Sequence, residues 1–310
     1  YWAAITLAAV LGQIGLPGGG IGFGYGAING MGAGGSRIAP PALPMGENQV
    51  KAFIPVARIA DMLEYPGQPF DYNGQRLTYP NTRLVYWCGG NPFHHHQDLG
   101  RLQRVWQRPE TIIVHEPWWN PLAKHADIVL PAATPMERND IAGTSLDSYV
   151  LAMHRVIDPV GEARTDHDIF CALSDRLGVR AAFTEGRDEK QWLEHMYGQW
   201  RTRAAAEGVT LPDFAAFWAA GAAELPDRTA GHVFLGRFRA EPEVYKLRTP
   251  SGKIELFSET IAGFKYDDCP GHATWFPPAE WLGAEKAKIY PLHLISNQPR
   301  TRLHSQYDNG

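Results

Sequence analysis

Three short apolar runs, lying close together in the sequence, constrain the fold of this chain most. Residues 84–88, 111–114 and 128–130 are rich in aromatic and β-branched side chains, and each ends at a polar or turn-forming segment. A glycine turn and a helical pattern at residues 96–106 separate the first run from the second. Strand, turn, helix and strand in this order are typical of parallel βαβ units. The sequence therefore predicts an α/β fold with a Rossmann-like parallel sheet flanked by helices.

Apolar residues at helical spacing predict further helices outside this sheet. The expected helices cover residues 1–15, 47–64, 168–177 and 192–200. We expect the first to be a buried core helix ended by Gly15 and Pro17, and the third to turn Ile169, Phe170, Leu173 and Leu177 inward. Short strand-like pieces occur at residues 232–235, 253–257 and 291–296.

Changes in composition divide the chain into four parts. Residues 1–80 lead into the core, and residues 81–262 form the Rossmann-like domain. Residues 263–288, rich in Pro, Gly and Trp, form a linker, and residues 289–310 begin a C-terminal β domain that is cut short. The chain opens without an initiator Met, so we expect it to be an internal piece of a longer polypeptide.

Composition excludes several classes of protein. Lys and Arg number 29 against 33 Asp and Glu, a net charge of -4, which argues against nonspecific nucleic-acid binding. The apolar run at residues 1–15 lacks a basic flank and is shorter than the roughly 20 residues that span a bilayer, so no membrane span is expected. The three cysteines are far apart, which favours buried thiols in a reducing compartment over a disulfide framework.

Polar residues follow the first two predicted strands, where open α/β sheets bind ligands. Asn91 and His95 come after the glycine turn and can donate hydrogen bonds to phosphate or ribose oxygens; the alternative is that the histidines only cap a helix. Glu116 closes the second strand and can accept from a sugar hydroxyl or from N1 and N2 of guanine. A solvated acid at a strand end is the alternative.

Two more candidates follow the third strand. Arg138 can bind a phosphate through two hydrogen bonds, or it can pair internally with Glu137 or Asp140. Thr165 or Asp166 suits a helix cap. Because the glycine turn is not GxGxxG, a nicotinamide cofactor bound here is not indicated. Spacing alone predicts a nucleotide-binding α/β unit of non-standard type.

The chain resembles the molybdopterin oxidoreductases of the DMSO reductase type. The resemblance runs in order along essentially the whole chain, through residues 11–20, 91–98, 125–132, 137–140, 249–255 and 302–306. Residues 87–90 and 251–255 favour the branch of the family that reduces biotin sulfoxide, with the branches that reduce TMAO and DMSO next.

The resemblance implies a cofactor of two molybdopterin guanine dinucleotides that together hold one molybdenum. Its contact positions in the Rossmann-like domain match Asn91, His95, His115, Glu116, Arg138 and Asp166. Those at the start of the C-terminal domain match Ser296, Asn297, Gln298, Pro299, Arg302, His304, Ser305 and Gln306. Glu116 departs from the family, in which Asp is frequent. The serine ligand of molybdenum would precede Tyr1, so no catalytic or metal-ligating residue is named.

The resemblance further implies an enzyme that reduces an S-oxide or N-oxide (biotin sulfoxide, DMSO or TMAO) by oxygen-atom transfer. Its electrons would come from a donor protein or a reduced nicotinamide cofactor, and the isolated piece would be inactive. We expect the cytoplasm as its location, or the periplasm if a preceding segment carries a twin-arginine signal. The alternative is a nonenzymatic guanine-nucleotide-binding regulatory module, which predicts tight binding of GDP or GTP by this chain alone.

Overall fold

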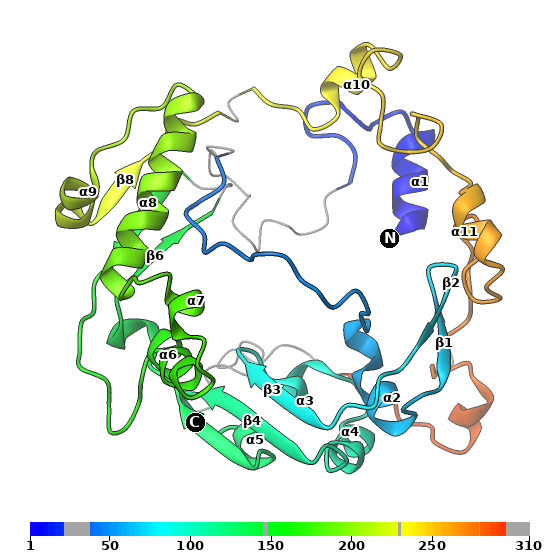
Figure 1. Cartoon of the computed structure of the whole chain (residues 1–310). Coiled ribbons are helices and arrows are strands. Elements are labelled where there is room, and N and C mark those ends of the chain that lie inside the picture. Colours follow the sequence, from blue (N-terminus) through cyan, green and yellow to red (C-terminus); the bar gives the residue numbers. More distant parts are fainter. Residues whose placement is uncertain (22–37, 145–147, 229–230, 279, 296–310) are drawn as a thin grey trace. The chain divides into compact units, whose positions relative to one another are not determined.

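The computed structural model describes residues 1–21, 38–144, 148–228, 231–278 and 280–295 (Figure 1). The chain divides into two compact units. The first unit comprises Tyr1–Phe23, Pro66–Pro80 and Val233–Gly310, and the second comprises Gly24–Tyr65 and Asn81–His232. The domain boundaries expected at residues 80, 262 and 288 stay predictions.

The second unit contains the expected parallel sheet, so the α/β prediction is confirmed. Its strands are β3 (Leu84–Cys88), β4 (Thr111–Glu116) and β5 (Ile128–Pro131), in the order β3-β4-β5. Both pairs are parallel, with Cys88 opposite His115 and Glu116 opposite Pro131. The apolar run at residues 112–114 suits the central place of β4 in the sheet, because a central strand is covered on both faces.

Three short helices flank this sheet, and each begins at a side-chain cap. They are α3 (Pro92–His95), α4 (Leu99–Val105) and α5 (Pro121–Lys124), capped by Asn91, Asp98 and Asn120. The helical pattern expected at residues 96–106 corresponds to α4, whose Leu102, Val105 and Trp106 are buried, although Leu99 is exposed. With Ile112, Val114 and Leu122, these residues form a core that we call the Trp106 cluster.

A fourth segment extends the sheet beyond β5. Ala132 pairs with Arg164 in a parallel bridge, and the Arg164 N–H donates to the Pro131 carbonyl at 3.0 Å. Helix α6 (Asp166–Arg176) starts directly afterwards, with the Thr165 hydroxyl accepting from the Asp168 N–H at 3.1 Å. The start of α6 therefore lies at the edge where the parallel strands end.

The expected inward residues of α6 are only partly correct. Ile169 is buried, but Leu173 and Leu177 are exposed. The helix also buries Cys171 and Ser174. Because successive residues turn by about 100°, Cys171 and Ser174 lie on a different side of the helix from Ile169, Leu173 and Leu177, and of these three only Ile169 is covered.

The helix expected over residues 47–64 is much shorter in the structure. It consists of a 3-10 turn, Val56–Arg58, and α2 (Ile59–Glu64). A proline disfavours helical backbone in the residue before it, so Pro55 prevents an earlier start.

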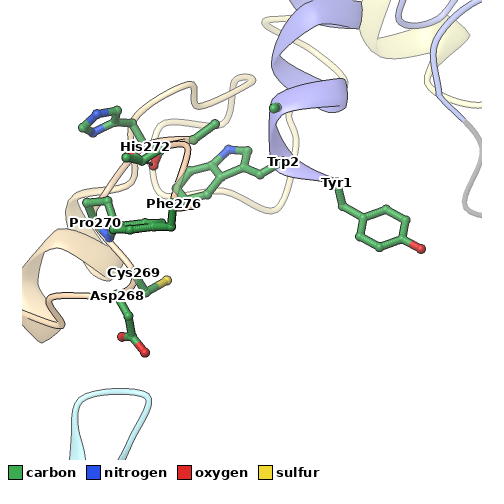
Figure 2. A pocket seen from close by; sticks show the side chains of 10 residues that line it. Tyr1, Trp2, Asp268, Cys269, Pro270, His272 and Phe276 are labelled. Atoms are coloured by element: carbon green, nitrogen blue, oxygen red, sulfur yellow. Dashed lines mark hydrogen bonds between the residues drawn. The ribbon is translucent and has the colours of Figure 1, made fainter. Parts of the chain in front are cut away.

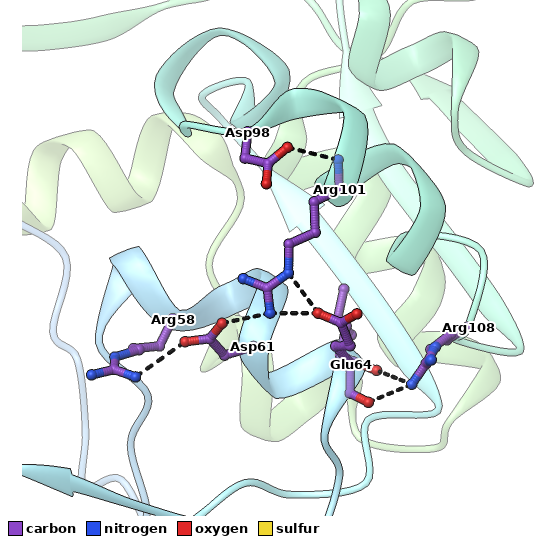
Figure 3. Close-up of polar contacts among 7 residues, drawn as sticks. Arg58, Asp61, Glu64, Asp98, Arg101 and Arg108 are labelled. Atoms are coloured by element: carbon purple, nitrogen blue, oxygen red, sulfur yellow. Dashed lines mark hydrogen bonds and ion pairs between the residues drawn. The ribbon is translucent and has the colours of Figure 1, made fainter. Parts of the chain in front are cut away.

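Ionic contacts join α2 to α4 (Figure 3). The Arg101 guanidinium contacts the carboxylates of Asp61 at 2.7 Å and Glu64 at 2.5 Å. The Arg108 Nη1 donates to the Leu63 and Glu64 carbonyls, so a cation satisfies the carboxyl end of α2.

A second, antiparallel sheet in the same unit packs with α8 (Glu189–Ala206), an 18-residue helix, and with the shorter α9 (Phe214–Ala220). Its strands are β6 (Asp140–Gly143), β7 (Tyr149–Met153) and β8 (Ala222–Glu224), in that order. The helices after α6 are α7 (Arg180–Thr184), α8 and α9, and α8 confirms the helix expected at residues 192–200. Tyr197, Trp200, Phe217 and Val150 are fully buried in a core that we call the Trp200 cluster.

The first unit holds α1 (Trp2–Val10), a hairpin of β1 (Pro69–Tyr72) and β2 (Gln75–Thr78), and three short helical segments, α10 (Gly236–Ala240), α11 (Glu259–Phe264) and η4 (Glu285–Lys288). The expectation of a buried core helix at the start is wrong, because Ala8 is its only buried residue. The helix is apolar all round, whereas the described residues cover little of its surface.

The strand-like pieces at residues 232–235, 253–257 and 291–296 do not form strands where the structure describes them. A strand needs a backbone partner, and these segments have only the single bridge between Phe257 and His272. The expected burial of the thiols holds for Cys171 alone, since Cys88 and Cys269 are exposed, and all three are free. No described helix combines the length and apolar character needed to cross a bilayer.

Candidate functional site

The carboxyl ends of the parallel strands gather several polar side chains at one edge, which we call the sheet edge. Asn91 follows β3, Glu116 closes β4, and Asp166 follows the Arg164 segment. Arg138 lies there too, since its Nη1 donates to the carbonyl of Ala133, just beyond β5, at 3.2 Å. The strand order and register confirm that these positions converge, while their contact with a cofactor stays a prediction.

Asn91 is the most buried of these side chains, with 2% of its surface exposed. Its Oδ1 accepts from the Phe93 N–H at 3.0 Å and caps α3. Its Nδ2 is buried and has no hydrogen-bond partner among the described residues. A buried donor left without an acceptor costs about 1–3 kcal/mol, so this amide is suited to an acceptor on a ligand.

Two glycines precede Asn91 with left-handed backbone. Gly89 and Gly90 have φ of +79° and +75°, and a Cβ at either position would meet nothing within 4 Å. Left-handed backbone favours glycine, and the open space above it lets a ligand approach the main chain. His95, at the last turn of α3, is exposed near the same strand end.

Glu116 is half-buried at the end of β4. Burial raises the pKa of its carboxyl, while the Asn120 side chain and the Trp118 N–H partly offset this rise. Its Oε1 accepts from the Trp118 N–H at 3.4 Å, a long and weak hydrogen bond. A ligand that donates further hydrogen bonds would stabilise the ionised form of this partly buried carboxylate.

The tryptophans after Glu116 are a feature that the sequence interpretation missed. Trp118 and Trp119 are both exposed, directly beyond the end of β4. Two adjacent tryptophans following a strand-ending acid were the available signal. Their rings offer apolar surface to a planar group at the sheet edge.

His115 is held between two polar partners. Its Nδ1 lies 2.7 Å from Asp166 Oδ1, and its Nε2 lies 2.8 Å from the Tyr86 hydroxyl. Asp166 is therefore not the cap of α6, a role that Thr165 fills. The sequence interpretation missed Tyr86. Cys88 is the register partner of His115, and Tyr86 lies two residues before Cys88 on β3, so the Tyr86 and His115 side chains are on the same face of the sheet.

Arg138 adopts the internal pairing that the sequence left open. Its Nε lies 3.2 Å from Asp140 Oδ2, whereas Glu137 bonds to Thr134 and Val160 instead. Binding of a phosphate by Arg138 stays a prediction. The other expected contact residues lie outside the described part of the chain: Ser296, Asn297, Gln298, Pro299, Arg302, His304, Ser305 and Gln306.

A separate pocket of about 240 Å³ lies in the first unit. Its lining includes Trp2, Cys269, His272 and Phe276, and Figure 2 shows Trp2 of α1 directed at the loop that carries Phe276. It contains none of the predicted cofactor-contact residues. Over the described ranges, no three His, Cys, Asp or Glu side chains group so that they could hold a metal ion.

Comparison with known proteins identifies the family. A family model described as "Molybdopterin oxidoreductase" matches residues 1–176, more than half of the chain. The chain belongs to the molybdopterin oxidoreductase family. The molybdopterin oxidoreductase match covers β3, β4, β5 and α6, the elements that form the sheet edge.

Curated relatives narrow the similarity within the molybdopterin oxidoreductases. Biotin sulfoxide reductase of Cereibacter sphaeroides is 53% identical over 100% of this chain and 41% of its own length. The dimethyl sulfoxide/trimethylamine N-oxide reductase of Rhodobacter capsulatus is 45% identical over 99% of this chain and 39% of its own. Trimethylamine-N-oxide reductase of Haemophilus influenzae is 44% identical over the same shares. The expected order of resemblance is confirmed.

The chain spans about two fifths of the length of these curated relatives. Among solved structures, acetylene hydratase from Pelobacter acetylenicus has a TM-score of 0.47 and 21% identity. That match covers 69% of this chain and 26% of the hydratase chain.

Proposed function

We propose that the protein containing this chain is a molybdenum-dependent oxidoreductase that reduces an S-oxide or an N-oxide by oxygen-atom transfer. The observation that carries the proposal is similarity along the full length of the chain, at 53% and 45% identity, to proteins named for reduction of biotin sulfoxide and of dimethyl sulfoxide or trimethylamine N-oxide. The higher identity favours biotin sulfoxide as the first substrate to test.

We further propose that the sheet edge binds the guanine dinucleotide part of a bis(molybdopterin guanine dinucleotide) cofactor. The residues present fit this group. The unpartnered Asn91 Nδ2 offers a donor to a phosphate or ribose oxygen, and Gly89 and Gly90 leave the backbone open. Glu116 and Asp166 offer carboxylate acceptors for ribose hydroxyls or for N1 and N2 of guanine.

In this role the residues of the sheet edge bind and orient, and the chemistry comes from elsewhere. The bound molybdenum group would supply Lewis acidity and two-electron redox chemistry. Asn91 and the glycine turn fix one end of the nucleotide, while the carboxylates at the ends of β4 and at the start of α6 fix the other. A fixed nucleotide holds the attached pterin in one place, which is the positioning that catalysis requires.

The electron donor and the location of the protein are also proposals. We propose a donor protein or a reduced nicotinamide cofactor as the source of electrons. We propose the cytoplasm as its compartment, with the periplasm as the alternative if a twin-arginine signal precedes the chain. Three cysteines without a disulfide support a reducing compartment.

Cofactor analysis of the full-length protein tests the function. The protein is purified from a molybdenum-replete host, and its molybdenum, the GMP released by acid and the reduction of biotin sulfoxide, DMSO and TMAO are measured. We expect molybdenum with two GMP per protein and reduction of at least one of these oxides. A well-folded preparation without metal and pterin contradicts the proposal.

Two glutamates at opposite ends of β4 provide a matched test of the sheet edge. Glu116→Gln is expected to lower the GMP content, because an amide cannot accept as a carboxylate does. Glu110→Gln is the control, since Glu110 pairs with Arg83 at 2.6 Å at the other end of the strand. Equal GMP content in the two variants would exclude Glu116 from the nucleotide site.

A further inference from the structure

A continuous hydrogen-bonded chain leads from the sheet interior to the sheet edge. The Tyr86 hydroxyl of β3 contacts His115 Nε2 of β4 at 2.8 Å, and His115 Nδ1 contacts Asp166 Oδ1 of α6 at 2.7 Å. Three elements that are distant in sequence thus contribute one residue each. The chain ends on a carboxylate whose side chain is 53% exposed, whereas the histidine side chain in its middle is 1% exposed.

Aromatic packing prevents the His115 ring from turning. The Phe170 ring lies 4.9 Å from the imidazole, centroid to centroid, and the Tyr86 ring lies 5.3 Å away. The Tyr86 and Phe170 rings also stack on each other at 5.8 Å. The imidazole therefore has one orientation, and its two nitrogens have one partner each.

Hydrogen-bond complementarity fixes which nitrogen of a neutral His115 carries the proton. An ionised carboxylate only accepts, so Nδ1 must carry the proton that faces Asp166. Nε2 is then an acceptor, and the Tyr86 hydroxyl donates to it. Burial, followed by electrostatic interaction with Cys88 and Asp166, raises the pKa of Tyr86 above its ordinary value of 10.0, so its hydroxyl keeps its proton at neutral pH.

The carboxylate of Asp166 is not required by its own helix. Thr165 caps α6 by accepting from the Asp168 N–H at 3.1 Å. One carboxylate oxygen is oriented by His115, and the rest of the group faces solvent at the edge where Glu116 and Asn91 also lie. An oriented carboxylate at such an edge suits a ligand with adjacent N–H donors.

We propose that Tyr86 and His115 are positioning residues that hold Asp166 ready to accept hydrogen bonds from the N–H groups of a guanine base. This inference rests on the proposed binding of the guanine dinucleotide at the sheet edge. The Asp166 carboxylate keeps the proton of His115 on Nδ1, and the Tyr86 hydroxyl holds the imidazole by donating to Nε2, so that His115 in turn orients the Asp166 carboxylate. Neither residue touches the base itself.

Nucleotide binding by the cofactor-free full-length protein tests the role of Tyr86. The protein is made in a host that lacks the pterin, and its affinities for GDP and CDP are measured by calorimetry. We expect Tyr86→Phe to weaken GDP binding about tenfold, the effect of one hydrogen bond to a charged network, and to change CDP binding less than about twofold. General destabilisation would instead lower both affinities alike.

Two substitutions of His115 separate its two hydrogen bonds. In His115→Asn the side-chain amide takes the place of Nδ1 and can still donate to Asp166, whereas in His115→Gln it reaches the place of Nε2 and Tyr86. We expect His115→Asn to retain more of the preference for GDP over CDP than His115→Gln. Both substitutions remove the imidazole ring from between Tyr86 and Phe170. The thermal unfolding temperatures of the two variants are therefore compared, to show that they lose similar stability.

The outcomes distinguish this inference from the function on which it rests. If the wild-type protein does not prefer GDP to CDP, the proposed nucleotide site is wrong, and the role of Tyr86 fails with it. If the wild type prefers GDP, and Tyr86→Phe keeps the full preference, only the positioning role is wrong. If His115→Gln matches or exceeds His115→Asn, orientation of Asp166 through Nδ1 is excluded.

Discussion

Two glutamates near the sheet edge have carboxyl pKa values displaced in opposite directions. Glu137, 4% exposed, accepts from the Thr134 N–H and hydroxyl and from the Val160 N–H, each at 2.7 Å. These hydrogen bonds, the Thr134 N–H first, lower its pKa. Glu116 has few donors, and burial raises its pKa. The same residue type therefore stabilises the fold at one position and opposes it at the other.

Replacing Glu137 should change the acid sensitivity of the chain. Because its folded pKa lies below the ordinary value of 4.5, its contribution to the free energy of unfolding is present above that pH and is lost as pH falls through the folded value. We expect Glu137→Gln to be less stable than wild type at about pH 7 and to lose less stability on acidification. Urea unfolding at several pH values measures the free energy of unfolding of both proteins. An equal loss of stability on acidification in wild type and variant would contradict the prediction.

Replacing Glu116 should have the opposite effect. A raised folded pKa means that its contribution is present below the ordinary value of 4.5 and is lost as pH rises through the folded value. Glu116→Gln should therefore be more stable than wild type at about pH 7, with the gain vanishing near pH 4. Glu110→Gln, at the other end of β4, should show no such gain. A loss of stability at neutral pH for Glu116→Gln would contradict the prediction.

Among the elements, α2 and α4 are joined by ion pairs of Arg101 in addition to apolar packing of Leu63 in the Trp106 cluster. This guanidinium contacts Asp61 and Glu64, and all three side chains are less than a third exposed. Arg101→Met keeps the apolar stem but leaves two partly buried carboxylates together. We expect the free energy of unfolding to fall by about 1–2 kcal/mol, a range typical of hydrogen bonds to charged groups.

Arg104→Met on the same helix is the matched control, because Arg104 is exposed. It should change the free energy of unfolding by less than about 0.5 kcal/mol. Equal effects of the two substitutions in denaturant titrations would show that Arg101 does not hold α2 against α4.

The elements that the sequence predicted well have local causes. β3, β4 and β5 are apolar runs bounded by turn residues, and the caps of α4 and α6 are Asp and Thr side chains visible in the sequence. The failures depend on the rest of the molecule. Residues 291–295 have strand composition but no backbone partner among the described residues, and α1 is apolar without being covered.

Of the site residues, the sequence predicts the relative positions only of those that lie at the ends of strands. Parallel strands place Asn91 and Glu116 at one edge by topology alone. The contact of His115 with Asp166 needs the position of α6, and the partner of Tyr86 needs the strand register. The unpartnered amide of Asn91 follows from packing, which no spacing rule contains.

For the molecule as a whole, the two hydrophobic cores described above both lie in the second unit. The Trp106 and Trp200 clusters belong to it, as do all the largest fully buried side chains among the described residues. Trp200→Ala should therefore lower the free energy of unfolding of the chain by about 3–5 kcal/mol. Trp275→Ala, a residue of the first unit that is 79% exposed, should change it by less than about 0.5 kcal/mol. Comparable losses in chemical denaturation would contradict this division.

The bridge between Ala132 and Arg164 brings together the two ends of the segment 133–163. The chain leaves the parallel sheet after β5, forms the β6–β7 hairpin, and returns beside its point of departure. The residues between Ala132 and Arg164 include Arg138, which bonds to Ala133 at the sheet edge, and Val150, which is fully buried in the Trp200 cluster, so both are constrained. We therefore expect insertions to be tolerated only at the exposed turns of this stretch, with Asp166, two residues after Arg164, kept in place by the bridge.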